Sequence, residues 1–153
     1  MRWRELVLIT AVLCTSALDG WAAKARIYKV LPHRLDQRGR HALSPSLYER
    51  DAYQAYLHTH PEECSALRFD IQWRANGVTP DNVRLRVELR TAKTDPGKPL
   101  VLETPVKPRL ARSRWSAVTL EGDRYKTAGG IIAWRTTLWE GERLLAEQKS
   151  FLW

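Results

Sequence analysis

The sequence has little cysteine. Of its two cysteines, Cys14 lies near the N-terminus, so residues 26–153 contain Cys64 alone. A single thiol excludes an internal disulfide, and the stability of this region must come from packing. Cys64 is therefore a small buried apolar residue, a free thiol, or one half of a bridge between two chains.

Catalytic and cofactor motifs are absent as well. The chain contains no G-x-S-x-G elbow, and no glycine-rich turn exposes Cys64 ahead of the strand predicted to follow it. Glu62 and Glu63 are adjacent, so their carboxylates diverge in an extended segment. The sequence therefore favours a non-enzymatic protein that uses no cofactor.

Acidic residues are outnumbered. The chain carries 25 lysines and arginines against 17 aspartates and glutamates, which gives a formal net charge of +8. In an exported protein this balance favours contact with an anionic surface or polymer, and nucleic acid is not an expected partner.

Residues 1–25 have the pattern of a cleavable signal peptide. Two arginines precede an apolar run from Leu6 to Leu13, which is shorter than the roughly 20 residues that span a bilayer. Ala23-Lys24-Ala25 fits the small-x-small rule best, and the possible cleavage sites follow Ala22, Ala23 or Ala25. We expect an exported protein, periplasmic or extracellular, whose residues 26–153 form one domain without a transmembrane span.

Alternation of apolar and polar residues predicts half-buried strands in the mature region. The residues predicted to line one core are Leu67, Phe69, Ile71, Trp73, Val83, Leu85, Val87, Leu89, Trp134 and Leu138. Strands are also expected over residues 26–31, ended by Pro32, and over residues 100–106, 115–120, 131–139 and 143–153.

About seven short strands, separated by turn signals, predict an antiparallel two-sheet sandwich. The segment Leu120-Glu121-Gly122-Asp123-Arg124-Tyr125 resembles the tyrosine corner of immunoglobulin-like folds, although their Cys…Trp…Cys pattern is absent. The expected fold class is mostly β, an immunoglobulin-like sandwich with one short helix inserted after the first strand.

That helix is predicted at about residues 46–58. Ser46 and Glu49 form a capping box, and Ser44 followed by Pro45 is an equally good start. Apolar residues then recur at helical spacing from Leu47 to Tyr56. An isolated helix of this length is marginal in water. We therefore expect it to plug an open end of the sandwich or to cover an outward apolar strip.

The final hairpin has a predicted register. Its first strand should turn Ile132, Trp134, Thr136 and Leu138 toward the core. Pairing Leu138 with Leu144 then requires a three-residue loop or a β-bulge near Gly141, because a slip by one residue reverses the faces.

Three groups of residues are candidate sites. His58, His60 and Cys64 combine imidazoles and a thiol that could ligate zinc or copper, although a solvated helix end accounts for the same residues. An outward aromatic strip of Trp139, Phe151 and Trp153 beside Arg135 is a candidate binding surface. The third candidate is the basic loop with Lys107, Arg109, Arg112 and Arg114.

These features favour an exported, non-enzymatic module that binds or assembles with another component of the cell envelope. The alternative is a carbohydrate or anionic-polymer binding module that uses the aromatic strip and the basic loop. A small metal-binding protein or enzyme based on residues 58–64 is the third hypothesis. The expected partner is an envelope protein or an anionic glycan or lipid surface.

Overall fold

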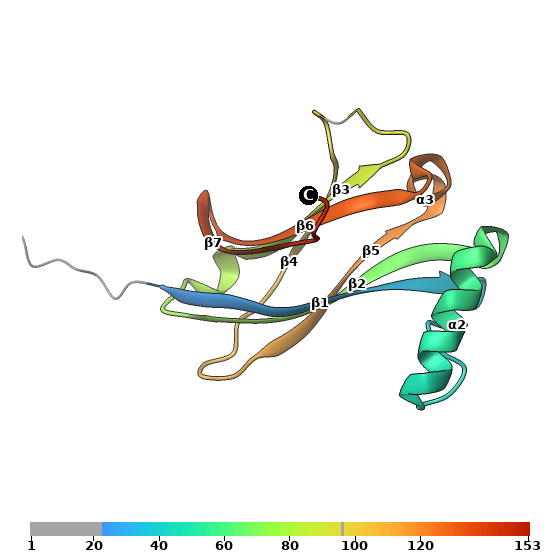
Figure 1. The fold of residues 1–153 in the computed structure, drawn as a ribbon. Coiled ribbons are helices and arrows are strands. Elements are labelled where there is room, and N and C mark those ends of the chain that lie inside the picture. The colour runs from blue at the N-terminus through green and yellow to red at the C-terminus, as the bar shows by residue number, and fades with distance from the viewer. Residues whose placement is uncertain (1–22, 96) are drawn as a thin grey trace, which may run out of the picture.

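The alternating segments pair into two antiparallel sheets in the computed structural model, which describes residues 23–95 and 97–153 (Figure 1). One sheet has the strand order β1-β2-β5 and the other has the order β4-β3-β6-β7. The strands are β1 (Lys24–Asp36), β2 (Cys64–Asn76), β3 (Val83–Thr91), β4 (Leu100–Pro105), β5 (Arg114–Glu121), β6 (Ile131–Glu140) and β7 (Arg143–Lys149). The helices are α2 (Leu47–Thr59) and α3 (Gly122–Ala128), with short 3-10 turns η1 (Pro61–Glu63) and η2 (Pro80–Asn82).

The core lies between the two sheets, where the apolar faces of β2 and β3 meet. Nine of the ten predicted core residues are buried, and Trp134 is half-buried with its ring edge-on to Phe69 at 6.4 Å between centroids. The prediction of one core is therefore confirmed, and so is the mostly β, antiparallel two-sheet sandwich.

The strand order differs from that of a constant-type immunoglobulin domain, where the fourth strand shares a sheet with the fifth. Here β4 pairs with β3 in the other sheet. The segment that resembles a tyrosine corner forms α3, which carries the chain from β5 to β6. Tyr125 lies in this helix beside Cys64, so the predicted corner is wrong.

The first strand is longer than predicted, because β1 continues through Pro32 to Asp36. Pro32 lies opposite Phe69 on β2. β1 is the edge of its sheet, and an edge strand tolerates proline because one of its sides has no hydrogen-bonded neighbour.

The register of the final hairpin also differs from the prediction. Leu138 lies opposite Ala146 rather than Leu144, and the bulge falls at Leu145, beyond the tight turn at Gly141. A β-bulge was predicted near Gly141, whereas the structure has it at Leu145.

Two further expectations about the final hairpin are wrong. Ile132 is exposed, although it was predicted on the core face. β7 ends at Lys149, and the last residues form a turn in which the Trp153 N–H donates to the Ser150 carbonyl at 3.2 Å. This turn lays Trp153 over the outward face of the four-stranded sheet.

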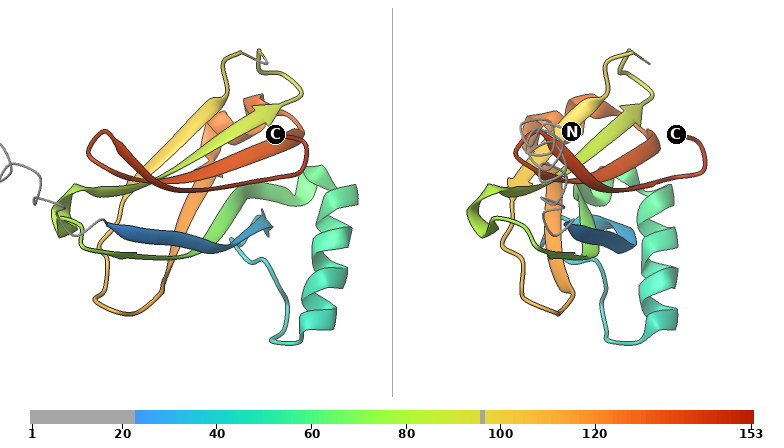
Figure 2. Two further views of the ribbon diagram at one scale, coloured as in Figure 1. Left: turned by 60° about the vertical axis from the view of Figure 1, so that its left-hand side comes forward. Right: turned by 90° about the vertical axis from the view of Figure 1, so that its left-hand side faces the viewer.

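The predicted helix is present as α2. Its N-cap is Ser46, whose side chain accepts a hydrogen bond from the Glu49 N–H at 3.4 Å. The helix projects from the end of the sandwich where β1 finishes (Figures 1 and 2). None of the helices in the described part of the chain has the length and apolar content needed to cross a membrane.

The predicted signal peptide lies almost entirely outside the described residues, which begin at Ala23. Lys24 and Ala25 already pair with the end of β2. Cleavage after Ala25 would remove both pairs, whereas cleavage after Ala22 would leave the whole of β1.

Candidate functional site

Helix α2 is anchored at one end of the sandwich through Asp36, the last residue of β1. The Asp36 carboxylate accepts hydrogen bonds from the Arg38 and Arg40 backbone N–H groups and the Tyr53 hydroxyl, each at 2.8 Å. Burial alone would raise the pKa of this carboxyl. The donors around it, with the Arg40 guanidinium, lower its pKa from 3.8 to about 2.

A second anchor joins α2 to the free edge of β1. The Arg34 N–H donates to Gln54 Oε1 at 2.7 Å, and Gln54 Nε2 donates to the Arg34 carbonyl at 2.9 Å. The Gln54 amide thus occupies the place that a neighbouring strand would take. It satisfies backbone groups that an edge strand otherwise leaves open.

Most of α2 is nevertheless exposed, and Leu57 is its only buried residue. Tyr48, Ala52, Ala55 and Tyr56 form one exposed face of the helix, here called the α2 stripe. Leu47 is 67% exposed and Tyr48 is 84% exposed. The expectation that the helix buries its apolar face by plugging an end or covering a strip is therefore wrong.

The C-terminal part of the stripe, at Tyr56, is held by contacts with its neighbours. The Tyr56 ring stacks on His60 at 4.1 Å between centroids and on Tyr53 at 6.1 Å. The Tyr56 hydroxyl donates to the Glu63 carboxylate at 2.5 Å. An exposed aromatic held in this way loses little side-chain entropy when it binds a partner.

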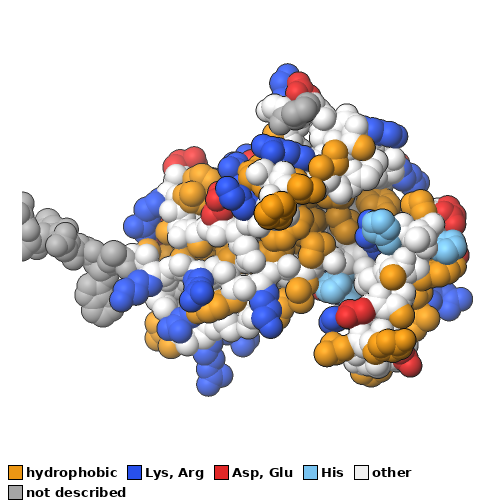
Figure 3. Space-filling view, in the orientation of Figure 1, with side chains coloured by type: hydrophobic (Ala, Val, Ile, Leu, Met, Phe, Trp, Pro, Cys, Tyr) orange, Lys and Arg blue, Asp and Glu red, His pale blue; other side chains and the backbone are white. Residues whose placement is uncertain are grey.

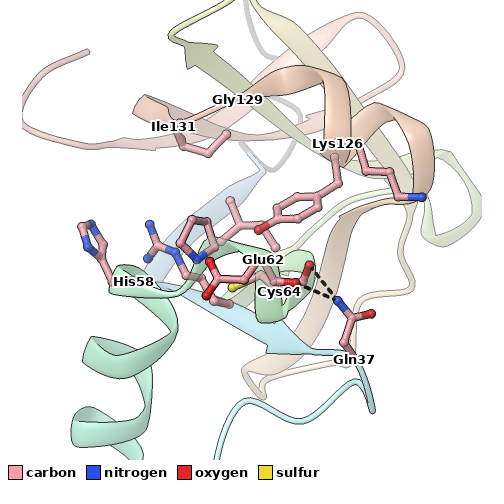
Figure 4. Close-up of a pocket in the computed structure, with 12 residues that line it drawn as sticks. Gln37, His58, Glu62, Cys64, Lys126, Gly129 and Ile131 are labelled. Atoms are coloured by element: carbon pink, nitrogen blue, oxygen red, sulfur yellow. Dashed lines mark hydrogen bonds between the residues drawn. The ribbon is translucent and has the colours of Figure 1, made fainter.

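A cavity of about 680 Å³ lies at the C-terminal end of α2, between η1 and α3 (Figure 4). Cys64 and Glu62 lie on its lower side in this view, Ile131 lies above, and Gln37 donates to the Glu62 and Cys64 carbonyls at 3.3 Å. The other lining residues are Arg34, His58, Pro61, Leu67, Tyr125, Lys126, Gly129 and Gly130. The cavity therefore has an apolar interior with charged groups around it.

Two of the titratable groups that line this cavity, Cys64 and Tyr125, are held in their neutral forms. Burial raises the pKa of the Cys64 thiol, and burial together with the neighbouring thiol raises the pKa of Tyr125 to about 12. Cys64 Sγ donates to the Leu57 carbonyl at 3.3 Å. A protonated thiol that donates to a backbone carbonyl is a structural group, which agrees with the prediction of a small buried residue.

The metal hypothesis fails on geometry. His60 Nδ1 lies 2.9 Å from the Tyr56 carbonyl, His58 is exposed, and Cys64 is buried. Across residues 23–95 and 97–153, no group of three His, Cys, Asp or Glu side chains converges as metal ligands would. The three predicted ligands share a segment but not a common point.

The structure places Trp139 and Trp153 of the predicted aromatic strip on the outward face of the four-stranded sheet, with arginines against their rings. The Arg84 guanidinium lies 5.8 Å from the Trp139 ring centroid, and those of Arg90 and Arg135 lie 4.3 and 4.9 Å from that of Trp153. Phe151 is fully exposed. The two tryptophans are therefore engaged in cation–π contacts and do not present a bare platform.

The basic loop lies between β4 and β5, away from the C-terminal turn (Figures 1 and 2). Arg109 and Arg112 face each other across a tight turn, and Leu110 at its tip is 89% exposed. The Arg114 guanidinium donates to the Lys107 carbonyl at 2.6 Å, and Lys107 Nζ lies 3.4 Å from Asp81. The structure thus keeps the two predicted binding surfaces separate.

No protein-family model, curated protein or solved structure matches this chain.

The cavity could not be predicted from the sequence, because its lining comes from three stretches of the chain, residues 34–37, 58–67 and 125–131. Arg34 belongs to β1, Cys64 opens β2, and Tyr125 lies in α3. The one related signal in the sequence was the helix predicted after the first strand, whose C-terminal end adjoins the cavity.

Proposed function

We propose that the protein is an exported, non-enzymatic binding module of the cell envelope that docks a protein partner at the α2 end of the sandwich. The observation that carries this proposal is the exposed α2 stripe, on a helix whose C-terminal end adjoins a cavity of about 680 Å³. Orange side chains mark this exposed apolar surface along the helix in Figure 3.

The chemistry of this end suits a protein partner. Tyrosines are enriched among the residues that contribute most to binding, and such residues lie next to pockets that accept a side chain from the partner. Tyr48 and Tyr56 supply the aromatic surface, and the cavity at the base of the helix can accept an apolar side chain. The preformed stacking of Tyr56 reduces the entropy lost on binding.

A non-enzymatic role is supported by the state of Cys64. A nucleophilic thiol needs a lowered pKa and an adjacent base, whereas burial raises the pKa of Cys64. Export is supported by the signal-peptide pattern of the first 25 residues.

The alternative, a carbohydrate-binding module, loses much of its support. Sugars stack on open aromatic faces, and arginines lie against the Trp139 and Trp153 rings. Of the two surfaces that this alternative would use, only the basic loop remains open to a ligand.

Site-specific photocrosslinking in the native envelope tests the proposal. A photoreactive phenylalanine at Tyr48 should give one discrete protein adduct, and Tyr56→Ser should remove it, because truncating a central interface tyrosine weakens binding by about thirtyfold. Leu144, which is 48% exposed on β7, is the matched control and should give no such adduct. Equal adducts from both positions, or none from Tyr48, would contradict the proposal.

A further inference from the structure

The end of the sandwich at which β1 begins carries an unusual concentration of positive charge. The strand register places Arg26 beside Arg74, and it places Lys29 beside Gln72 and, one strand further, Trp115. The Arg109–Arg112 turn joins this group, because the Ala111 N–H donates to Asn76, whose strand neighbour is Lys24. We call these residues the entry patch: Arg26, Lys29, Arg74, Arg109, Leu110, Arg112 and Trp115.

The cations of the entry patch have no acidic partners within the described residues, whereas most arginines of the four-stranded sheet do. On that sheet Arg135 lies 2.6 Å from Glu88, and Arg86 lies 3.3 Å from Glu103. No ion pair among residues 23–95 and 97–153 involves any of the five entry-patch cations. Figure 3 shows Lys and Arg side chains gathered over the lower part of this end, with acidic side chains above them.

The entry patch also exposes apolar side chains between its charges. Leu110 is pushed outward by a turn in which Ala111 adopts a left-handed conformation with φ 58°, and Trp115 is 51% exposed. Exposed leucine and tryptophan among lysines and arginines are typical of surfaces that lie in the headgroup region of a membrane. A soluble anionic polymer would need the cations but not the leucine.

The position of the N-terminal apolar run is consistent with a membrane surface at this end of the domain. Residues 1–22, whose sequence contains the apolar run from Leu6 to Leu13, lead into β1 at Lys24, which lies at this same end. The apolar run of the sequence therefore precedes β1 at the end of the domain that carries the entry patch.

We propose that the entry patch binds the surface of an anionic phospholipid bilayer, with Arg109 and Arg112 on headgroup phosphates and Leu110 and Trp115 inserted between headgroups. This contact is independent of the proposed α2 docking site, which lies at the opposite end (Figure 1). It would hold the domain on the membrane with α2 directed away from it.

Vesicle co-sedimentation of the protein purified from its native host tests this proposal. The protein should bind vesicles of equimolar phosphatidylcholine and phosphatidylglycerol, should ignore vesicles of phosphatidylcholine alone, and should be released by high salt. Each cation near an anionic bilayer contributes about a fivefold factor, so Arg109→Gln with Arg112→Gln should weaken binding by about thirtyfold. Lys93→Gln with Lys98→Gln, which also removes two exposed charges from one loop, is the matched control and should change it little.

A second readout separates a bilayer from a soluble polyanion. Brominated lipid should quench the fluorescence of Trp115, and this quenching should be lost in Trp115→Phe. It should weaken in Leu110→Ser but not in Leu144→Ser. Equal binding to neutral vesicles, or equal loss in the control pair, would overturn the proposal. So would a Leu110→Ser variant that binds vesicles normally while the double arginine variant loses binding to heparin, since that pattern identifies a polyanion site. Circular dichroism of each variant establishes that it is folded.

Discussion

Strand β2 and helix α2 are neighbours in the chain and each has 13 residues, yet they use apolar residues in opposite ways. β2 lies between two strands and buries its entire alternating set, from Leu67 to Trp73. α2 buries Leu57 alone and is otherwise held by polar contacts from Asp36 and Gln54. An apolar pattern thus identifies an element, but its neighbours decide whether the apolar face is core or a binding surface.

The largest expected difference comes from one substitution made in each element. Leu67→Ala should lower the free energy of unfolding by about 2–5 kcal/mol, because Leu67 is buried and its loss leaves a cavity. Leu47→Ala, at a position 67% exposed, should change it by less than about 0.5 kcal/mol. Urea unfolding of the two variants checks this, and similar losses would mean that α2 packs on something within the same chain.

The anchor at Asp36 should make the protein sensitive to acid. Because its folded pKa of about 2 lies below the ordinary 3.8, the stabilisation is complete above about pH 4 and is lost as the pH falls toward 2. The shift corresponds to about 2 kcal/mol. Unfolding measured across this range should show the loss in the native protein and a flatter profile in Asp36→Asn. An unchanged profile in the variant would assign the acid sensitivity to other carboxylates.

The Gln54 anchor should have a smaller and more local effect. Gln54→Ala removes three hydrogen bonds and leaves the Arg34 backbone without its partner, at a cost of about 1–2 kcal/mol. Hydrogen exchange should accelerate in α2 and in the end of β1 while the amides of β2 and β3 keep their protection. Accelerated exchange throughout the sandwich would show that the helix and the core unfold together.

Replacing one polar group in the core should stabilise the protein rather than destabilise it. Thr136 is fully buried on β6, and its hydroxyl has no hydrogen-bond partner among the described residues. Thr136→Val keeps the shape and removes this unsatisfied group, so it should raise the unfolding free energy by about 1 kcal/mol. Thermal unfolding, with Thr136→Ser as the control that keeps the hydroxyl, measures this. A loss of stability in the valine variant would reveal a partner for the hydroxyl in solution.

The sequence predicted the strands well because their pattern is local. The alternation from Leu67 to Trp73 and from Val83 to Leu89 identifies both the strands and the faces that they bury. The same reasoning failed at Pro32, because whether proline ends a strand depends on its place at the edge of a sheet. It failed again at Leu138, because a bulge at Leu145 sets the register.

The candidate sites divide in the same way. The α2 helix was predicted from the sequence, with Ser46 as one of two candidate caps, since caps and helical spacing involve residues within one turn of each other. The cavity was not readable, because it joins Arg34, Cys64 and Tyr125 from segments far apart in the chain. The alternation predicted that Trp139 faces outward, but it did not predict the arginine against the Trp139 ring.

The sequence by itself determined the two-sheet sandwich, the central core and the position of the helix, because these depend on local periodicity and on burial of apolar surface. Only the tertiary structure decided that α2 leaves its aromatic face exposed, that α3 closes one side of a cavity, and that the basic loop contacts the end of β2 beside the start of β1. Those results depend on which strand edges meet and which loops lie together. Such long-range contacts join residues whose separation in the chain carries no periodic signal.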